Sequence, residues 1–250
     1  MKQQDEDMTR AIEAFEKIEE QYLYKEDEDV KHTKEVLAEA LVVVEQCTQA
    51  LGSNHPHTVE LYYMIGSMSF GIKDYSQSVE WFTKGANHGD DSSECELALM
   101  YQLGISVEKD LSKAFDLYTR AAEKGNEAAM FELGMMFQGG EGVEVDYVKA
   151  AEWYSKLATK GDGLASMWLA WCLHMSGDNT KALVWAQRNA KNKPDDNFII
   201  YTLACIYQAI GHPKEALRYF ELCLKLEEEQ GISDDIKDET KQRIMELNPE

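Results

Sequence analysis

The chain has 250 residues, of which 44% are hydrophobic and 28% charged, so it can bury a core and is not expected to be disordered throughout. Its 46 acidic and 25 basic residues give a formal net charge of −21. This excess disfavours nucleic acid and anionic membrane surfaces as direct partners, because both are negatively charged. Acidic runs near the ends, at 26–29 and 227–229, are interpreted as solvated helix faces or, alternatively, as docking surfaces for a basic partner.

The start of the sequence is polar and acidic, and no apolar stretch of membrane-spanning length follows anywhere. The cysteines are five in number, widely spaced and without a CxxC pair: Cys47, Cys95, Cys172, Cys205 and Cys223. This pattern favours reduced thiols over a disulfide framework. We therefore expect a cytoplasmic protein.

Residues 6–25 and 30–52 are predicted to form two long amphipathic helices. The second has an apolar stripe through Leu37, Leu41, Val44 and Cys47, at the spacing of one helix face. Residues 52–57 then form a connector. We interpret residues 1–56 as an N-terminal hairpin, a divergent repeat that caps the core.

Residues 57–228 contain five copies of an internal repeat, each with a small residue in both of its predicted helices. The first-helix markers are Gly66, Ala98, Gly134, Ala170 and Ala204. The second-helix markers, spaced by 36, 36, 32 and 34 residues, are Ser78, Ala114, Ala150, Ala182 and Ala216. Four positions after the second marker come Phe82, Tyr118, Tyr154, Ala186 and Phe220. Small residues let neighbouring helices approach, and the aromatic rings fill the space between helix layers.

Capping residues recur in the same register. The predicted starts of the second helices carry Asp74, Asp110, Asp146 and Asp178. The predicted ends carry Gly89, Gly125 and Gly161, because glycine accepts the left-handed conformation that closes a helix. Each copy is therefore predicted to be a helix–turn–helix unit.

The clearest unit, residues 129–156, resembles a Sel1-like repeat, a relative of the tetratricopeptide repeat. The matching residues are Leu133-Gly134, the turn Gly139-Gly140-Glu141-Gly142, Asp146, Lys149-Ala150, Trp153-Tyr154 and Lys156. Residues 94–126 match more loosely, and units 57–90, 163–194 and 195–228 lack four turn residues and are closer to tetratricopeptide units. The resemblance implies an all-α fold, a right-handed α-solenoid of tandem helix–turn–helix repeats.

The acidic segment 229–250 is predicted to be a C-terminal capping region, with a closing helix at 233–247. Its apolar positions are Ile236, Ile244 and Leu247, and either Asp234 or Asp235 is expected to cap it.

No motif in the sequence indicates an active site, because Walker A, GxGxxG, HExxH and GxSxG patterns are all missing. The glycines at 139–142 are explained as a repeat turn. His55 and His57 are interpreted as a polar turn before a helix, since further metal ligands cannot be placed. We expect no catalytic, cofactor or metal site.

The first helices are expected to line a concave groove through the positions three before, one after and four after each marker. The predicted groove residues are Tyr63, Phe70, Leu99, Gln102, Phe131, Met135, Gln138, Met167, Trp171, His174, Tyr201 and Gln208, and the same rule adds Ser67, Cys95 and Cys205. No Lys or Arg occurs among these fifteen positions, so a cationic clamp for a C-terminal carboxylate is not expected. An amphipathic helix or an extended apolar peptide fits better. The alternative is that the array buries these residues against its own neighbours.

The expected function is non-catalytic protein–protein interaction, as an adaptor or scaffold, which rests partly on the resemblance. The alternative is an inhibitor or immunity protein that occupies a toxin or enzyme, because acidic charge would attract a basic partner. An enzyme with an unrecognised site is a remote alternative. The sequence does not indicate the oligomeric state.

Overall fold

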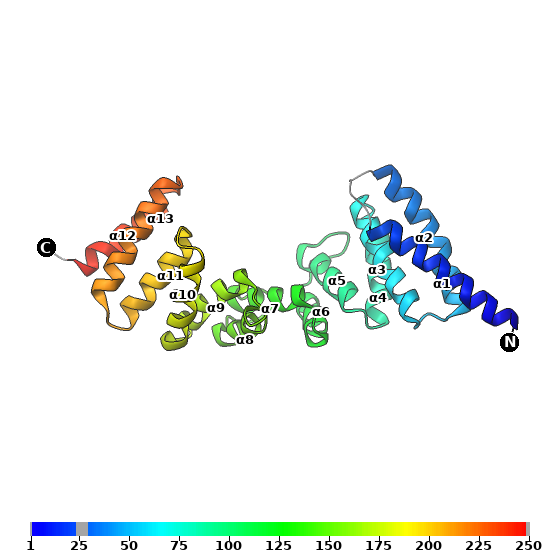
Figure 1. Ribbon diagram of the computed structural model, residues 1–250, viewed down its shortest axis with the longest axis horizontal. Helices are drawn as coiled ribbons and strands as arrows, with labels where there is room; N and C mark the ends of the chain where they lie inside the picture. Colours follow the sequence, from blue (N-terminus) through cyan, green and yellow to red (C-terminus); the bar gives the residue numbers. More distant parts are fainter. Residues whose placement is uncertain (1, 24–29, 249–250) are drawn as a thin grey trace. The chain divides into compact units, whose positions relative to one another are not determined.

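The computed structural model describes residues 2–23 and 30–248, which form thirteen α-helices and no strand (Figure 1). The helices are α1 (Lys2–Leu23), α2 (Val30–Ala50), α3 (Pro56–Gly71), α4 (Tyr75–Asn87), α5 (Asp91–Leu103), α6 (Leu111–Lys124), α7 (Glu127–Gly139), α8 (Tyr147–Ala158), α9 (Gly163–Met175), α10 (Asn179–Asn192), α11 (Asn197–Ala209), α12 (Pro213–Glu229) and α13 (Asp234–Leu247). The fold is an all-α solenoid of helical repeats, as predicted. The acidic run 26–29 lies outside the described residues, and the run 227–229 ends α12.

The chain divides into two compact units, which we call unit 1 (Met1–Ala129) and unit 2 (Met130–Glu250). Within each unit, consecutive helices pack against each other, as α3 does on α4 and α11 on α12 (Figure 1). Helix α7 crosses the boundary, and its residues from Met130 onward belong to unit 2. None of the helices in the described residues has the length and apolar content needed to cross a lipid bilayer.

The small-residue markers lie where two helices of one hairpin touch. A side chain on Gly66 would place its Cβ 2.6 Å from the ring of Phe82, and one on Gly134 would meet the Tyr154 ring at 2.7 Å. The buried second-helix aromatics are Phe82, Tyr118, Tyr154 and Phe220. The predicted roles of the small residues, which let helices approach, and of the aromatic rings, which fill the space between them, are therefore confirmed at Gly66–Phe82 and Gly134–Tyr154.

The predicted second-helix caps are also confirmed. The side-chain carboxylates of Asp74, Asp110, Asp146 and Asp178 each accept a hydrogen bond from the backbone N–H three residues later, at 3.2, 2.9, 3.0 and 3.2 Å. Gly89, Gly125 and Gly161 have φ values of +84°, +107° and +101°, which residues with a side chain rarely adopt. These contacts satisfy backbone groups that helix ends leave unpaired.

The N-terminal hairpin shares a core with the first repeat. Its helices extend over 2–23 and 30–50, and α3 already begins at Pro56, inside the predicted connector. One apolar cluster joins Phe15 of α1, Val44 of α2 and Ile65 of α3. His55 accepts a hydrogen bond from the backbone N–H of His57 at 3.3 Å, so it caps α3 as part of a polar turn.

The expected cap of the closing helix is wrong. Helix α13 begins at Asp234, and the residue in the cap position is Ser233, whose extended backbone has φ −59° and ψ 149°. Asp234 and Asp235 lie in the first turn instead, where their charges favour the positive end of the helix. Ile244 and Leu247 pack on the last repeat, but Ile236 is 49% exposed.

Candidate functional site: the first-helix face

The first twelve predicted groove residues all remain accessible to solvent in part. We use the name first-helix face for the partly exposed side chains of α3 and α5 in unit 1 and of α7, α9 and α11 in unit 2. The twelve predicted residues on it are Tyr63, Phe70, Leu99, Gln102, Phe131, Met135, Gln138, Met167, Trp171, His174, Tyr201 and Gln208, and none of them is buried. Met135 is the most open, at 46% exposed, whereas its neighbour Met136 is in the core.

Cys205 does not belong to this face, although its position one residue after the Ala204 marker predicted that it would line the groove. It is 7% exposed and lies in a cluster with Phe220, against which Ile244 and Leu247 of α13 pack. The closing helix therefore covers a position that a repeat in mid-array would leave open. Cys205 is a core residue.

In unit 1 the first-helix face combines rings with a positioned amide. The ring centroids of Tyr63 and Phe82 lie 6.0 Å apart, and the Tyr118 hydroxyl donates a hydrogen bond to Gln102 Oε1 at 2.8 Å. Helix α1 reaches the same surface, where the Tyr22 hydroxyl donates to Ser67 Oγ at 3.0 Å. The N-terminal hairpin thus occupies part of the face in unit 1.

In unit 2 the face has an aromatic centre. The Trp171 ring lies 5.8 Å from His174 on the same helix and 5.8 Å from Phe198, which belongs to α11. Phe198 also lies 5.0 Å from Trp168. Trp171 is partly accessible to solvent. Phe198 and Trp168 were not among the predicted groove residues.

Polar groups on this part of the face are held by neighbouring side chains. Gln138 Oε1 accepts hydrogen bonds from the Tyr154 hydroxyl at 3.2 Å and from Cys172 Sγ at 3.7 Å. His174 Nδ1 lies 2.7 Å from Asn179 Oδ1, so the imidazole donates to the amide oxygen.

Tyr201, at the far end of unit 2, contacts the closing helix. Its hydroxyl donates to Glu239 Oε1 at 2.5 Å, and its ring meets Phe220 edge-on at 5.6 Å. Helix α13 therefore limits the face on that side.

The fourth repeat departs from the others because Ala186 stands where its neighbours have an aromatic ring. Ala186 is buried, and beside it runs a narrow crevice lined by Met167, Ala170 and Thr202. The crevice is too tight for a water molecule, so the surrounding side chains have closed most of the space that a ring would fill.

Glu132 is a residue of this region that the groove rule missed. It is half-buried on α7, one residue after Phe131, and in the described part of the chain no cation lies within ion-pair distance of it. Burial raises its pKa, and the nearby negative charge of Glu141 raises it further. A signal was present in the sequence, since Glu96 occupies the same repeat position 36 residues earlier.

Glu94 differs from Glu132, because cationic side chains of the same chain neutralise its charge. Glu94 is fully buried, and it accepts hydrogen bonds from Arg120 and from Lys124 Nζ, the latter at 2.7 Å. Lys124 and Arg120 also donate to backbone carbonyls at the end of α4. Glu94 therefore joins α5 to α6 as a structural ion-pair cluster.

Two buried thiols of unit 2 are unsuited to nucleophilic chemistry. Burial raises the pKa of Cys172 to about 12 and that of Cys205 to about 11, which keeps both sulfurs protonated at neutral pH. Among the described residues, no group of three His, Cys, Asp or Glu side chains could hold a metal ion. The arrangement offers apolar and hydrogen-bonding contacts, which are suited to binding.

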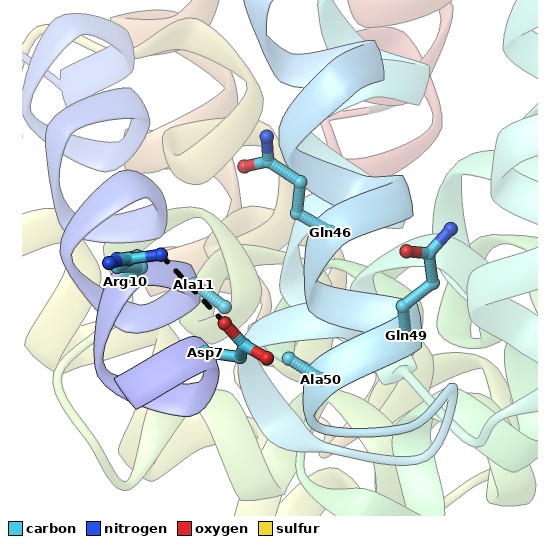
Figure 2. A pocket seen from close by; sticks show the side chains of 6 residues that line it. All are labelled: Asp7, Arg10, Ala11, Gln46, Gln49 and Ala50. Atoms are coloured by element: carbon cyan, nitrogen blue, oxygen red, sulfur yellow. Dashed lines mark ion pairs between the residues drawn. The ribbon is translucent and has the colours of Figure 1, made fainter. Parts of the chain in front are cut away.

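Two hollows between packed helices lie away from the first-helix face, and a third, of about 810 Å³, borders the loop between α5 and α6. One, of about 410 Å³, lies between α1 and α2, where Arg10 and Asp7 form an ion pair at 3.9 Å beside Gln46 and Gln49 (Figure 2). The other, of about 390 Å³, is the second-helix groove; it is lined by α8, α9 and α10, including Val148, Leu173 and Trp185. Neither contains a predicted groove residue.

Family comparisons agree with the register of the repeats. The model of the Sel1 repeat matches residues 59–90, 91–126 and 127–162, and the model of the tetratricopeptide repeat matches residues 199–230. Between these matches lie residues 163–198, which contain α9 and α10. No curated protein matches the sequence.

Solved structures of low sequence identity share the fold. A Sel1 repeat protein from Oxalobacter formigenes aligns with a TM-score of 0.55 at 19% identity, over 79% of this chain and 85% of its own. A protective antigen of uropathogenic Escherichia coli with an SLR fold aligns at 0.57 and 21%, over 92% of this chain and 56% of its own. YrrB, described as a TPR protein with an unusual peptide-binding site, aligns at 0.59 and 13%, over 73% and 91%.

Proposed function

This chain belongs to the Sel1-like repeat family, and we propose that it is an adaptor or scaffold that binds a partner protein in the concave groove formed by its first-helix face. Repeats of these two kinds are generally non-catalytic modules that bind other proteins or peptides. The partner would present a peptide or an amphipathic helix. We place the protein in the cytoplasm, with neither nucleic acid nor membrane as its direct partner.

The observation that carries this proposal is the accessibility of the aromatic and apolar residues at the groove positions. Phe131, Met135, Met167 and Trp171 are all exposed in part. Partly exposed Trp and Tyr side chains are typical of the residues that contribute most to protein interfaces. The groove positions lack Lys and Arg, which favours an apolar contact over recognition of a carboxylate.

A second candidate function is supported by the net charge of −21. An inhibitor or immunity protein that covers a basic toxin or enzyme would be helped by this charge, because it speeds the encounter with a positive surface. Such a protein would use the same first-helix face.

The test is Trp171→Ala, compared with wild type in affinity purification of the full chain followed by mass spectrometry. Truncating an interface aromatic typically weakens binding by about 2 kcal/mol or more, so the co-purifying partner should be lost. The melting temperature should stay within roughly a few degrees of wild type, because a partly exposed ring contributes little to the core.

Trp185→Ala is the control, since Trp185 lines the second-helix groove. It should leave the partner in place. Retention of the partner by Trp171→Ala, or its loss only with Trp185→Ala, would reject the first-helix face. A collapse of stability in Trp171→Ala would assign that ring to the core.

A further inference from the structure

The first-helix face of unit 2 contains a negative charge that the chain itself does not neutralise. Glu132 is half-buried, and no Lys, Arg or His of the described residues lies within ion-pair distance of it. Removing a carboxylate from water without a counter-charge costs free energy, and proteins normally pair such groups. The same fold does so at Glu94, which has two cationic partners.

The surroundings of Glu132 favour a cation from outside the chain. A second negative charge, on Glu141, makes the electrostatic potential around Glu132 more negative. The adjacent residue Phe131 presents an aromatic ring, and Trp171 presents another on the next first helix. Aromatic faces attract Lys and Arg side chains as well as apolar groups. Charge and rings together match a cationic side chain with a long apolar stem.

The polar groups beside the rings are suited to a peptide backbone. Gln138 Oε1 is already occupied by the Tyr154 hydroxyl, which orients the amide so that its N–H donors are available. His174 is oriented in the same way by Asn179. These two residues occupy equivalent positions of successive repeats, on helices about 8–10 Å apart. An extended chain advances about 3.3 Å per residue, so about three residues would span that distance.

A helical partner could not bond to Gln138 and His174 through its backbone, because its backbone groups are bonded internally. An extended segment has free carbonyl and N–H groups, to which both side chains can bind. The alternation of side chains along an extended segment also lets one residue point to Glu132 while a neighbour on the same side contacts Trp171.

We infer that the first-helix face of unit 2 recognises an extended peptide segment in which a Lys or Arg side chain pairs with Glu132 and a nearby apolar side chain packs on Trp171. This inference rests on the proposed function of that face and specifies the chemistry of its partner. It makes Glu132 the residue that selects a cationic ligand, with Gln138 and His174 holding the backbone.

The test uses a library of random twelve-residue peptides displayed on phage and selected on the full chain. The best peptide is then synthesised, together with a version in which its Lys or Arg is replaced by Gln. Both are titrated against wild type and against Glu132→Gln, Glu144→Gln and Trp171→Ala. Glu144 is the control carboxylate, since it is exposed on the loop after α7.

We expect selected peptides to be rich in Lys or Arg and to bind Glu132→Gln about tenfold more weakly than wild type. Glu144→Gln should bind as wild type does. Replacing the peptide cation should weaken binding to wild type but cause no further loss in Glu132→Gln, because the two changes remove the same contact.

The experiment distinguishes a failure of the inference about Glu132 from a failure of the proposed binding face. A peptide whose binding needs Trp171 but is unchanged by Glu132→Gln would overturn the inference and leave the proposed face in place. A peptide unaffected by both substitutions, or a library that yields no binder, would count against the face itself and against the inference with it.

Discussion

At the scale of single residues, the fold depends on a few positions where no side chain fits. Gly134 is the clearest, because the Tyr154 ring occupies the space that a Cβ would take, at 2.7 Å. Tyr154 is fully buried and cannot swing away into solvent. Its hydroxyl also holds Gln138, so the glycine supports the first-helix face indirectly.

Gly134→Ala should therefore lower the free energy of unfolding by about 1–3 kcal/mol through overpacking. Gly163→Ala is the matched control, since a Cβ at this first residue of α9 would meet nothing within 4 Å. That change should be neutral or slightly stabilising, because alanine restricts the unfolded chain. Equal thermal shifts in the two variants would contradict the assigned register.

Glu132 leads to a second prediction, which needs no partner. Because burial and Glu141 raise its pKa in the folded protein, the folded state binds this proton more tightly than the unfolded state does. Its contribution to stability therefore decreases as the pH rises through its titration range, and it is least favourable at neutral pH. Glu132→Gln should raise the free energy of unfolding at neutral pH, by no more than about 1 kcal/mol.

The gain should disappear in acid, where the carboxyl group of wild type is protonated as well. Thermal unfolding of both proteins across pH 4–8 measures this difference. Glu94→Gln is the contrasting variant and should be less stable than wild type, because it leaves Arg120 and Lys124 without their buried partner. A loss of stability in Glu132→Gln at neutral pH would show that its charge is compensated.

The environment of a residue could be predicted from the sequence where the same residue type recurs in several repeats. It could not be predicted where it depends on one neighbouring element outside the repeat pattern. Gly134 and Tyr154 recur as types in other units, so their contact could be predicted. The burial of Cys205 could not, because it depends on α13, which follows no repeat register. Whether Glu132 has a cationic partner depends on where the Lys and Arg side chains of the surrounding helices lie. The spacing of residues along the sequence does not reveal this.

At the scale of helices, the caps and the turns follow directly from residue type. Four second helices begin after the Asp residues that the periodicity selected. The closing helix is different, since the Ser233 side chain at its cap position makes no capping hydrogen bond. Helix α13 is held by packing against the last repeat and by hydrogen bonds from Tyr201 to Glu239 and from Thr240 to Glu227.

Ile244 and Met245 test that packing, because they are adjacent residues with opposite environments. Ile244 packs against the cluster around Phe220, whereas Met245 is 67% exposed. Ile244→Ala should cost about 1–2 kcal/mol of stability, less than a fully buried isoleucine would. Met245→Ala should be nearly neutral. Equal and small shifts in chemical denaturation would mean that α13 adds little to the last repeat.

At the scale of the whole molecule, the repeats indicate the class of function but not the partner. The same helical framework accepts different ligands through the side chains of its first helices, so the partner depends on surface residues that the repeat pattern leaves open. Here those residues are apolar, aromatic and neutral polar at the groove positions, within a chain of net charge −21. Both features favour a partner with apolar and basic groups.

Site-specific photo-crosslinking tests most directly whether partners bind the first-helix face. Benzoylphenylalanine would replace Met135 on this face in one variant and Val184 on α10 in another; these residues are 46% and 65% exposed. Each variant would be irradiated with the partner recovered by affinity purification. We predict a covalent adduct at position 135 and none at 184. An adduct at 184 with none at 135 would contradict the account.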